Sequence, residues 1–126
     1  MIALADVRAA LKAALQGLEL NVSDGGDLVP NGAAIGGFVV NYHPTIAGQA
    51  QAMAVAGCEI RIATDRADEA SAYERLDAAM TTIPPVIEAA PGPWRSVIVS
   101  TARPDSPLNV GDASYASLAL VCEFYI

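Results

Sequence analysis

The stretch "SLALVCEFYI", residues 117–126, decides the fold because its side chains alternate in character. Alternation with a period of two is typical of a β-strand with one face on a core. One set of positions is apolar throughout and contains Leu118, Leu120, Cys122, Phe124 and Ile126. The other set, traced back to residue 115, is mixed and contains Tyr115, Ser117, Val121, Glu123 and Tyr125. The first face is predicted to line the core, and the second to meet water or a partner.

A second stretch, "MAVAGCEIRIAT" at residues 53–64, repeats this alternation over an unusual length for a small domain. Its predicted core face contains Ala54, Ala56, Cys58, Ile60 and Ile62. Its mixed face contains Met53, Val55, Glu59 and Arg61. Because the two stretches match in pattern, we expect them to be neighbours in one sheet.

Helical spacing of apolar residues appears in two places. Residues 3–15 carry Leu4, Val7, Leu11 and Leu15 at steps of three and four, and the segment that follows Asp65 carries Tyr73, Leu76, Met80 and Ile83. The two prolines after Ile83 are predicted to end the second helix, with at most one further turn. Shorter strands are expected at residues 18–22, 38–44 and 94–104, and loops at residues 23–37 and 103–114. The sequence thus predicts a single α+β domain over residues 1–126, with an antiparallel or mixed sheet of four to five strands and two α-helices packed on one face.

Composition excludes several classes of protein. The 14 acidic and 7 basic residues give a net charge of −7, and the basic residues are scattered, which argues against a grip on nucleic acid. The sequence has no signal peptide pattern and no run of about 20 apolar residues, so we expect a protein that is made in the cytoplasm and does not enter a membrane. In that compartment the two cysteines should be reduced.

No recognisable active site appears in the sequence. The only histidine, His43, lacks a nucleophile and an orienting partner in any known motif. Cys58 and Cys122 fall on predicted core faces and are interpreted as buried thiols rather than a disulfide or metal ligands. Asp24 and Asp27 lack the spacing of a calcium loop. We therefore expect no catalytic residue, metal site or cofactor, and a protein that is not an enzyme.

The mixed faces of the two long strands pose the main question, because two helices can cover only one face of the sheet. A neighbouring subunit is one answer, and a half-solvated sheet with scattered apolar residues is the other. If a subunit covers them, the contact residues are Met53, Val55, Glu59, Arg61, Tyr115, Val121, Glu123 and Tyr125.

The order of these features resembles the tail terminator proteins of long-tailed (siphovirus-type) phages, particularly those that infect actinobacteria. The resemblance runs through "VRAALKAALQGL", "FVVNYHPTIAG", "CEIRIATDRADEASAYERLDAAM", "NVGDASY" and "ASLALVCEFYI", and covers nearly the whole chain.

The resemblance implies a structural virion protein in the tail-neck region, assembled in the host cytoplasm. Such proteins form a ring, expected to be a hexamer, that caps the head-proximal end of the tail tube and stops its polymerisation. They form the docking surface for the connector or stopper protein of the head and contact the major tail tube protein, while DNA only passes through the lumen. The expected docking contacts lie in the two long loops, at Asp24, Asp27, Asp105, Leu108, Asn109 and Asp112.

Two other readings remain open. A different small head–tail neck protein, a connector or stopper, would have the same style and would differ only in its binding partner. A small-molecule binding module or minor enzyme around His43 would need a concave pocket with convergent polar groups.

Overall fold

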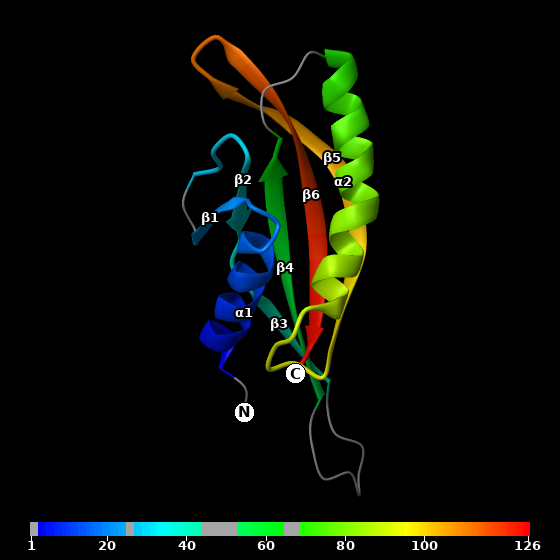
Figure 1. The fold of residues 1–126 in the computed structure, drawn as a ribbon. Helices are drawn as coiled ribbons and strands as arrows, with labels where there is room; N and C mark the ends of the chain where they lie inside the picture. The colour runs from blue at the N-terminus through cyan, green and yellow to red at the C-terminus, as the bar shows by residue number, and fades with distance from the viewer. Residues whose placement is uncertain (1–2, 25–26, 44–52, 65–68) are drawn as a thin grey trace, which may run out of the picture.

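The computed structural model describes residues 3–24, 27–43, 53–64 and 69–126, which form two helices and a six-stranded mixed sheet (Figure 1). In chain order the elements are α1 (Leu4–Gln16), β1 (Asn21–Asp24), β2 (Gly32–Ile35), β3 (Val39–His43), β4 (Met53–Ala63), α2 (Glu69–Ala89), β5 (Ser96–Val110) and β6 (Ala113–Tyr125). The strand order is β1-β2-β4-β6-β5, and β3 pairs with β4 below β2. Only β1 and β2 pair in parallel among these strands. The α+β class with helices packed on a sheet is confirmed, although the sheet has six strands instead of four to five.

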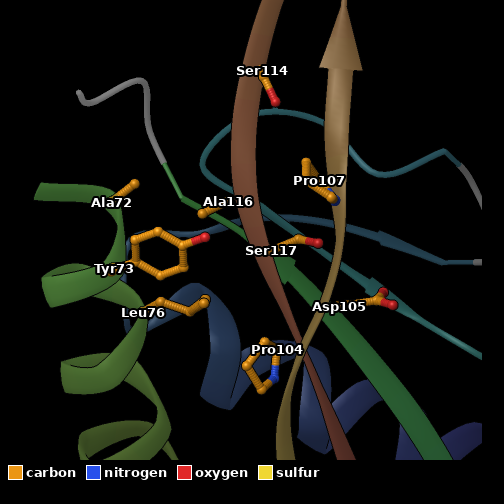
Figure 2. A pocket seen from close by; sticks show the side chains of 9 residues that line it. All are labelled: Ala72, Tyr73, Leu76, Pro104, Asp105, Pro107, Ser114, Ala116 and Ser117. Carbon is orange, nitrogen blue, oxygen red and sulfur yellow. The ribbon is translucent and has the colours of Figure 1, made fainter. Parts of the chain in front are cut away.

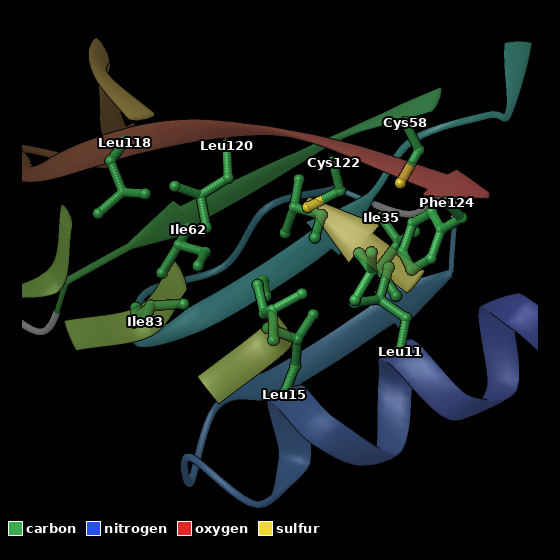
Figure 3. Packing of buried hydrophobic residues seen from close by; sticks show 14 of the residues in the cluster. Leu11, Leu15, Ile35, Cys58, Ile62, Ile83, Leu118, Leu120, Cys122 and Phe124 are labelled. Carbon is green, nitrogen blue, oxygen red and sulfur yellow. The ribbon is translucent and has the colours of Figure 1, made fainter. Parts of the chain in front are cut away.

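The predicted pairing of the two long alternating stretches is confirmed. β4 and β6 form the centre of the sheet, in antiparallel register from Val55 opposite Tyr125 to Ala63 opposite Ser117. Their even-numbered residues supply the core, which α1 and α2 close from one side (Figure 3). Leu118, Leu120, Cys122 and Phe124 are fully buried.

Helix α1 packs through the apolar stripe predicted from its sequence. Val7, Leu11 and Leu15 are spaced by four residues and are fully buried. Arg8, on the same helix, reaches the connection after β2: its guanidinium donates to the carbonyl oxygens of Ile35 at 3.3 Å and Gly36 at 2.9 Å. The same guanidinium lies 5.0 Å from the centroid of the Phe38 ring. This contact ties α1 to the segment between β2 and β3.

Helix α2 does not end at its prolines, so that part of the prediction was wrong, although its length past them is about the one further turn that was expected. It continues through Pro84 and Pro85 to Ala89. Ile83 is 9% exposed and Ile87 is fully buried, and core packing on both sides of the prolines holds the last turns in place despite the missing N–H groups. Tyr73 was expected in the apolar stripe but is 60% exposed, which leaves it on the surface of the helix.

The region between α1 and β3 is more ordered than predicted. Residues 18–22 do not form the first strand, because Glu19 has a φ of 63° and completes a turn, so that β1 begins at Asn21. Strand β2 lies within the expected loop at residues 23–37. Gly32 begins β2, and a Cβ there would lie 2.8 Å from the carbonyl oxygen of Asn21, so the two strands approach too closely for a side chain.

Candidate subunit interface

The face of the sheet opposite α1 and α2 is the candidate interface, called the open face below. It is formed by the odd-numbered residues of β3, β4 and β6 and by their partners on β5. The even-numbered residues of β4 and β6 point to the helices, as the core cluster demonstrates. The open face is divided into a charged band and an apolar band.

The charged band joins three strands across Ala119 of β6. Arg61 of β4 and Arg103 of β5 both lie opposite this small residue, and their side chains meet the carboxylate of Asp105. Arg61 Nε lies 2.8 Å from Asp105 Oδ2, while Arg103 lies 3.7 Å from Asp105 and 3.5 Å from Glu59. The hydrogen bond from Arg61 is the main cause that lowers the pKa of Asp105 below 3.8. Ala119 is fully buried although neither helix lies on its side of the sheet.

The apolar band crosses four strands next to the charged band. Val39, Gly57, Glu123 and Ile98 stand opposite one another in one row. Val39 is 66% exposed and stands beside Gly57, which adds no side chain, and Ile98 is 42% exposed and stands beside Glu123. Val55 and Tyr125 form the next row and are half-buried. The band is thus a mainly apolar surface that contains one acidic residue, Glu123.

The structure brings together most of the predicted contact residues. The open face carries Val55, Glu59, Arg61, Val121, Glu123 and Tyr125. Tyr115 lies apart from them, opposite Leu108 near the end of the sheet, and the side chain of Met53 is outside the described residues. Ser117 was assigned to the mixed face but is 1% exposed, and its buried hydroxyl donates to the carbonyl oxygen of Ser106 at 2.5 Å.

Sequence reasoning missed three members of this face: Val39, Ile98 and Arg103. The alternation of residues 94–104 could have placed Ile98 and Arg103 only if the irregularity between Val99 and Thr101 had been known, since the extra residue reverses the faces beyond it.

The predicted loop at residues 103–114 is a β-hairpin, so that prediction was wrong. β5 runs to Val110, β6 starts at Ala113, and Gly111 and Asp112 form the turn. Gly111 has a φ of 60°, a conformation that glycine adopts without steric cost at the first central position of a two-residue turn. The outer part of the hairpin, residues 106–116, is called the arm below. In Figure 1 it forms the orange hairpin at the end of the sheet where α2 begins.

The expected docking residues therefore have different settings. Asp105 belongs to the charged band, Leu108 and Asn109 lie in β5, and Asp112 is exposed in the turn. Val110, next to the turn, is 48% exposed. Among the expected residues of the first loop, Asp27 is exposed and Asp24 ends β1, with a side chain outside the described residues.

A hollow of about 500 Å³ lies between α2 and the base of the arm (Figure 2). Tyr73 and Leu76 line it from α2, and Pro104 and Pro107 line it from β5. Asp105 also borders it, but its carboxylate points away from Tyr73 in Figure 2, toward the charged band. The walls are mainly apolar and offer no constellation of acid, base and nucleophile.

Cys58 and Cys122 are buried free thiols, as predicted. They lie directly opposite each other on β4 and β6. The N–H of Ile126 donates to the carbonyl of Ala54, which makes the pairs of even-numbered residues hydrogen-bonded pairs with Cα atoms about 5.5 Å apart. In such pairs the Cβ atoms lie about 5.5 Å apart, beyond the roughly 3.5–4.5 Å that a disulfide requires, so the two thiols are poorly placed to form one. Burial raises the pKa of the Cys58 thiol to about 11 and also raises the pKa of Cys122.

Other chemistry finds little support in the described part of the chain. His43 ends β3, and its side chain is outside the described residues. Among the side chains that the structure describes, no group of three or more His, Cys, Asp or Glu residues could hold a metal ion. Neither α1 nor α2, over the residues described, is long and apolar enough to cross a membrane.

Comparison of the chain with protein-family models and with curated proteins finds no match.

Proposed function

We propose that the protein is a structural virion protein that forms a hexameric ring at the head-proximal end of a phage tail tube. In this role it stops polymerisation of the tube and offers the docking surface for the head connector. The single observation that carries the proposal is the open face, where exposed apolar residues lie on a sheet that neither helix covers on that side. The resemblance of the sequence to tail terminators supplies the ring and its place on the tube.

The energetics of the open face favour a protein contact. Val39 and Ile98 expose 66% and 42% of their surface, and burial of this exposed part would contribute roughly 1 kcal/mol for each side chain. A subunit contact that also covers Val121 and Tyr125 would remove a continuous apolar band from water. A ring of identical copies makes this contact with a different patch of the next copy, because closed rotation requires heterologous interfaces.

The charged band makes this contact compatible with an acidic protein. The chain carries a net charge of −7, which opposes association of copies. On the open face, however, Arg61 and Arg103 balance Glu59 and Asp105 in one ion-pair network. The same pairing occupies both guanidinium groups with carboxylates, which fits a ring through which DNA passes without being held.

The arm is the element best suited to contact the tube protein or the head connector. It carries an exposed valine and a turn acid, Val110 and Asp112, at the end of a paired hairpin. A hairpin presents such residues at lower entropic cost than an open loop, since its backbone is already ordered.

A phage that lacks the gene provides the test. We expect tail tubes longer than normal and not joined to heads, and we expect joining to return when purified protein is added to the extract. A shortened arm is the matched variant: deletion of residues 109–110 and 113–114 removes two strand pairs and leaves the Gly111–Asp112 turn closed by Leu108 and Tyr115. This variant should form rings but fail to restore joining. Tubes of normal length with only the heads unattached would contradict the terminator role and favour a connector or stopper.

A further inference from the structure

The longest strand of the sheet, β5, lies at its edge, where an unpaired row of backbone groups could accept another strand. We propose that Glu88, Pro104 and Pro107 close this edge to strand addition, so that copies of the chain meet through the open face and do not extend the sheet. The second half of this statement rests on the proposed ring, whereas the closed edge stands without it.

The hydrogen-bond pattern tells which residues of β5 face outward. Thr64 N–H donates to the carbonyl of Ala116, and Ile126 N–H donates to the carbonyl of Ala54. The even-numbered residues of β6 therefore bond to β4, and its odd-numbered residues bond to β5. The β5 residues that lie opposite even-numbered β6 residues therefore point their N–H and C=O groups away from the sheet. These outward residues of β5 include Val97, Val99, Ala102 and Pro104.

Two of the outward positions have no free donor. Pro104, opposite Leu118, has no N–H group to offer to an incoming strand. The N–H of Val99 lies 3.5 Å from Oε2 of Glu88, which reaches it from the last turn of α2. Any added strand would have to displace this carboxylate, and the negative charge of Glu88 would then lie next to the newly paired strands.

The geometry of the edge adds a second obstacle. The register of β5 shifts between Val99 and Thr101, and again between Asp105 and Leu108. Pro107 lies within the second irregularity and has no N–H group. Bulges bend and twist an edge strand away from the flat ladder that a neighbour needs. Of the four outward positions named above, Val97 and Ala102 keep an N–H that neither obstacle blocks, and Ala102 lies between the two blocked positions, Val99 and Pro104.

The test combines substitutions with hydrogen exchange. The triple variant Glu88→Ala, Pro104→Thr, Pro107→Thr reopens the edge, because alanine leaves the Val99 N–H without its acceptor and threonine, a residue that favours strands, restores an N–H at both proline positions. We expect it to form larger assemblies than the unmodified protein in sedimentation velocity, with exchange of the Ala102 amide slowed about tenfold. The matched control, Pro91→Thr with Pro93→Thr, removes two exposed prolines between α2 and β5 and should leave both measurements unchanged.

Hydrogen exchange of the unmodified protein keeps the test decisive if the triple variant does not fold. In assembled protein the Ala102 amide should exchange as fast as in the monomer. Slowing of this amide on assembly would overturn the inference and leave the ring intact. A triple variant that folds by circular dichroism but sediments like the unmodified protein would also overturn it. If the unmodified protein stays monomeric and the triple variant assembles through Ala102, the proposed ring is wrong and the inference of a closed edge stands.

Discussion

Replacement of Arg8 by methionine should destabilise the fold although the residue is far from the open face. The substitution keeps the aliphatic stem but removes two hydrogen bonds to backbone carbonyls, at 2.9 and 3.3 Å, and the contact 5.0 Å from the Phe38 ring. Hydrogen bonds from a charged donor contribute about 1.5–3 kcal/mol when well formed, and the ring contact contributes about 0.5–1 kcal/mol. Since one of the two hydrogen bonds is long, we expect Arg8→Met to lower the free energy of unfolding by about 2–4 kcal/mol.

Urea unfolding followed by tryptophan fluorescence measures this loss. Trp94 is the only tryptophan and lies 4.9 Å from the Phe124 ring, so its emission reports on the core. Arg103→Met is the matched control, because its ion pairs are long and half-exposed and should contribute less than about 1 kcal/mol. Equal losses for the two variants would refute the argument that Arg8 ties α1 to the segment after β2.

Three further predictions concern the core and the open face. Cys58 and Cys122 should not react with Ellman's reagent in the native protein, since the pKa of Cys58 is raised to about 11 by burial, and both should react in denaturant; fast native reaction would contradict their burial. The pKa of Asp105 is lowered in the folded state, so its ionised carboxylate stabilises the fold at pH values above 3.8, the ordinary pKa of the group. This stabilisation is lost as the pH falls through the lower pKa of the folded state. Asp105→Asn should therefore be less stable than the unmodified protein at neutral pH, and a gap in urea midpoint that persists in acid would refute this. Val121→Asp should abolish assembly and leave a folded monomer, whereas Leu120→Asp should prevent folding. Circular dichroism measures the folding of both variants, and the reverse result would mean that the two faces were assigned wrongly.

The periodic elements could be predicted from the sequence because one side of each is uniformly apolar. The stripe of α1 and the alternation of β4 and β6 are local patterns, and burial enforces both. The pairing of β4 with β6 was predicted from their matching patterns, and the observed register keeps both core faces on one side, since a slip by one residue would turn every core side chain to the other face.

The elements that sequence reasoning missed depend on partners that are distant in the chain. β2 contains only four residues among turn formers, and it is a strand because β1 and β4 pair with it. The arm contains a proline, an asparagine and several small residues, and its only clear local signal is the Gly-Asp turn flanked by strand formers. Helix α2 passes two prolines because Ile87 is buried beyond them, which no local rule reveals.

The open face was predicted in part for the same reason. Val55, Val121 and Tyr125 were identified because alternation places them opposite the core residues. Val39 and Ile98 were missed, since their place on the face depends on the pairing of β3 and on the irregularity after Val99. Asp105 was expected in a docking loop, but a residue 44 positions away, Arg61, holds it in the sheet.

The central claim is that a ring of this protein, joined through the open face, ends the growth of a tail tube. Its most direct test is the length of tubes grown from the purified major tail tube protein of the same phage, measured by electron microscopy with and without this protein. We predict that tubes stop growing when it is added, with one ring of six copies at a single end, and that Val121→Asp protein leaves growth unchanged. Tubes that grow to the same length in all three samples, with no ring at either end, would contradict the account.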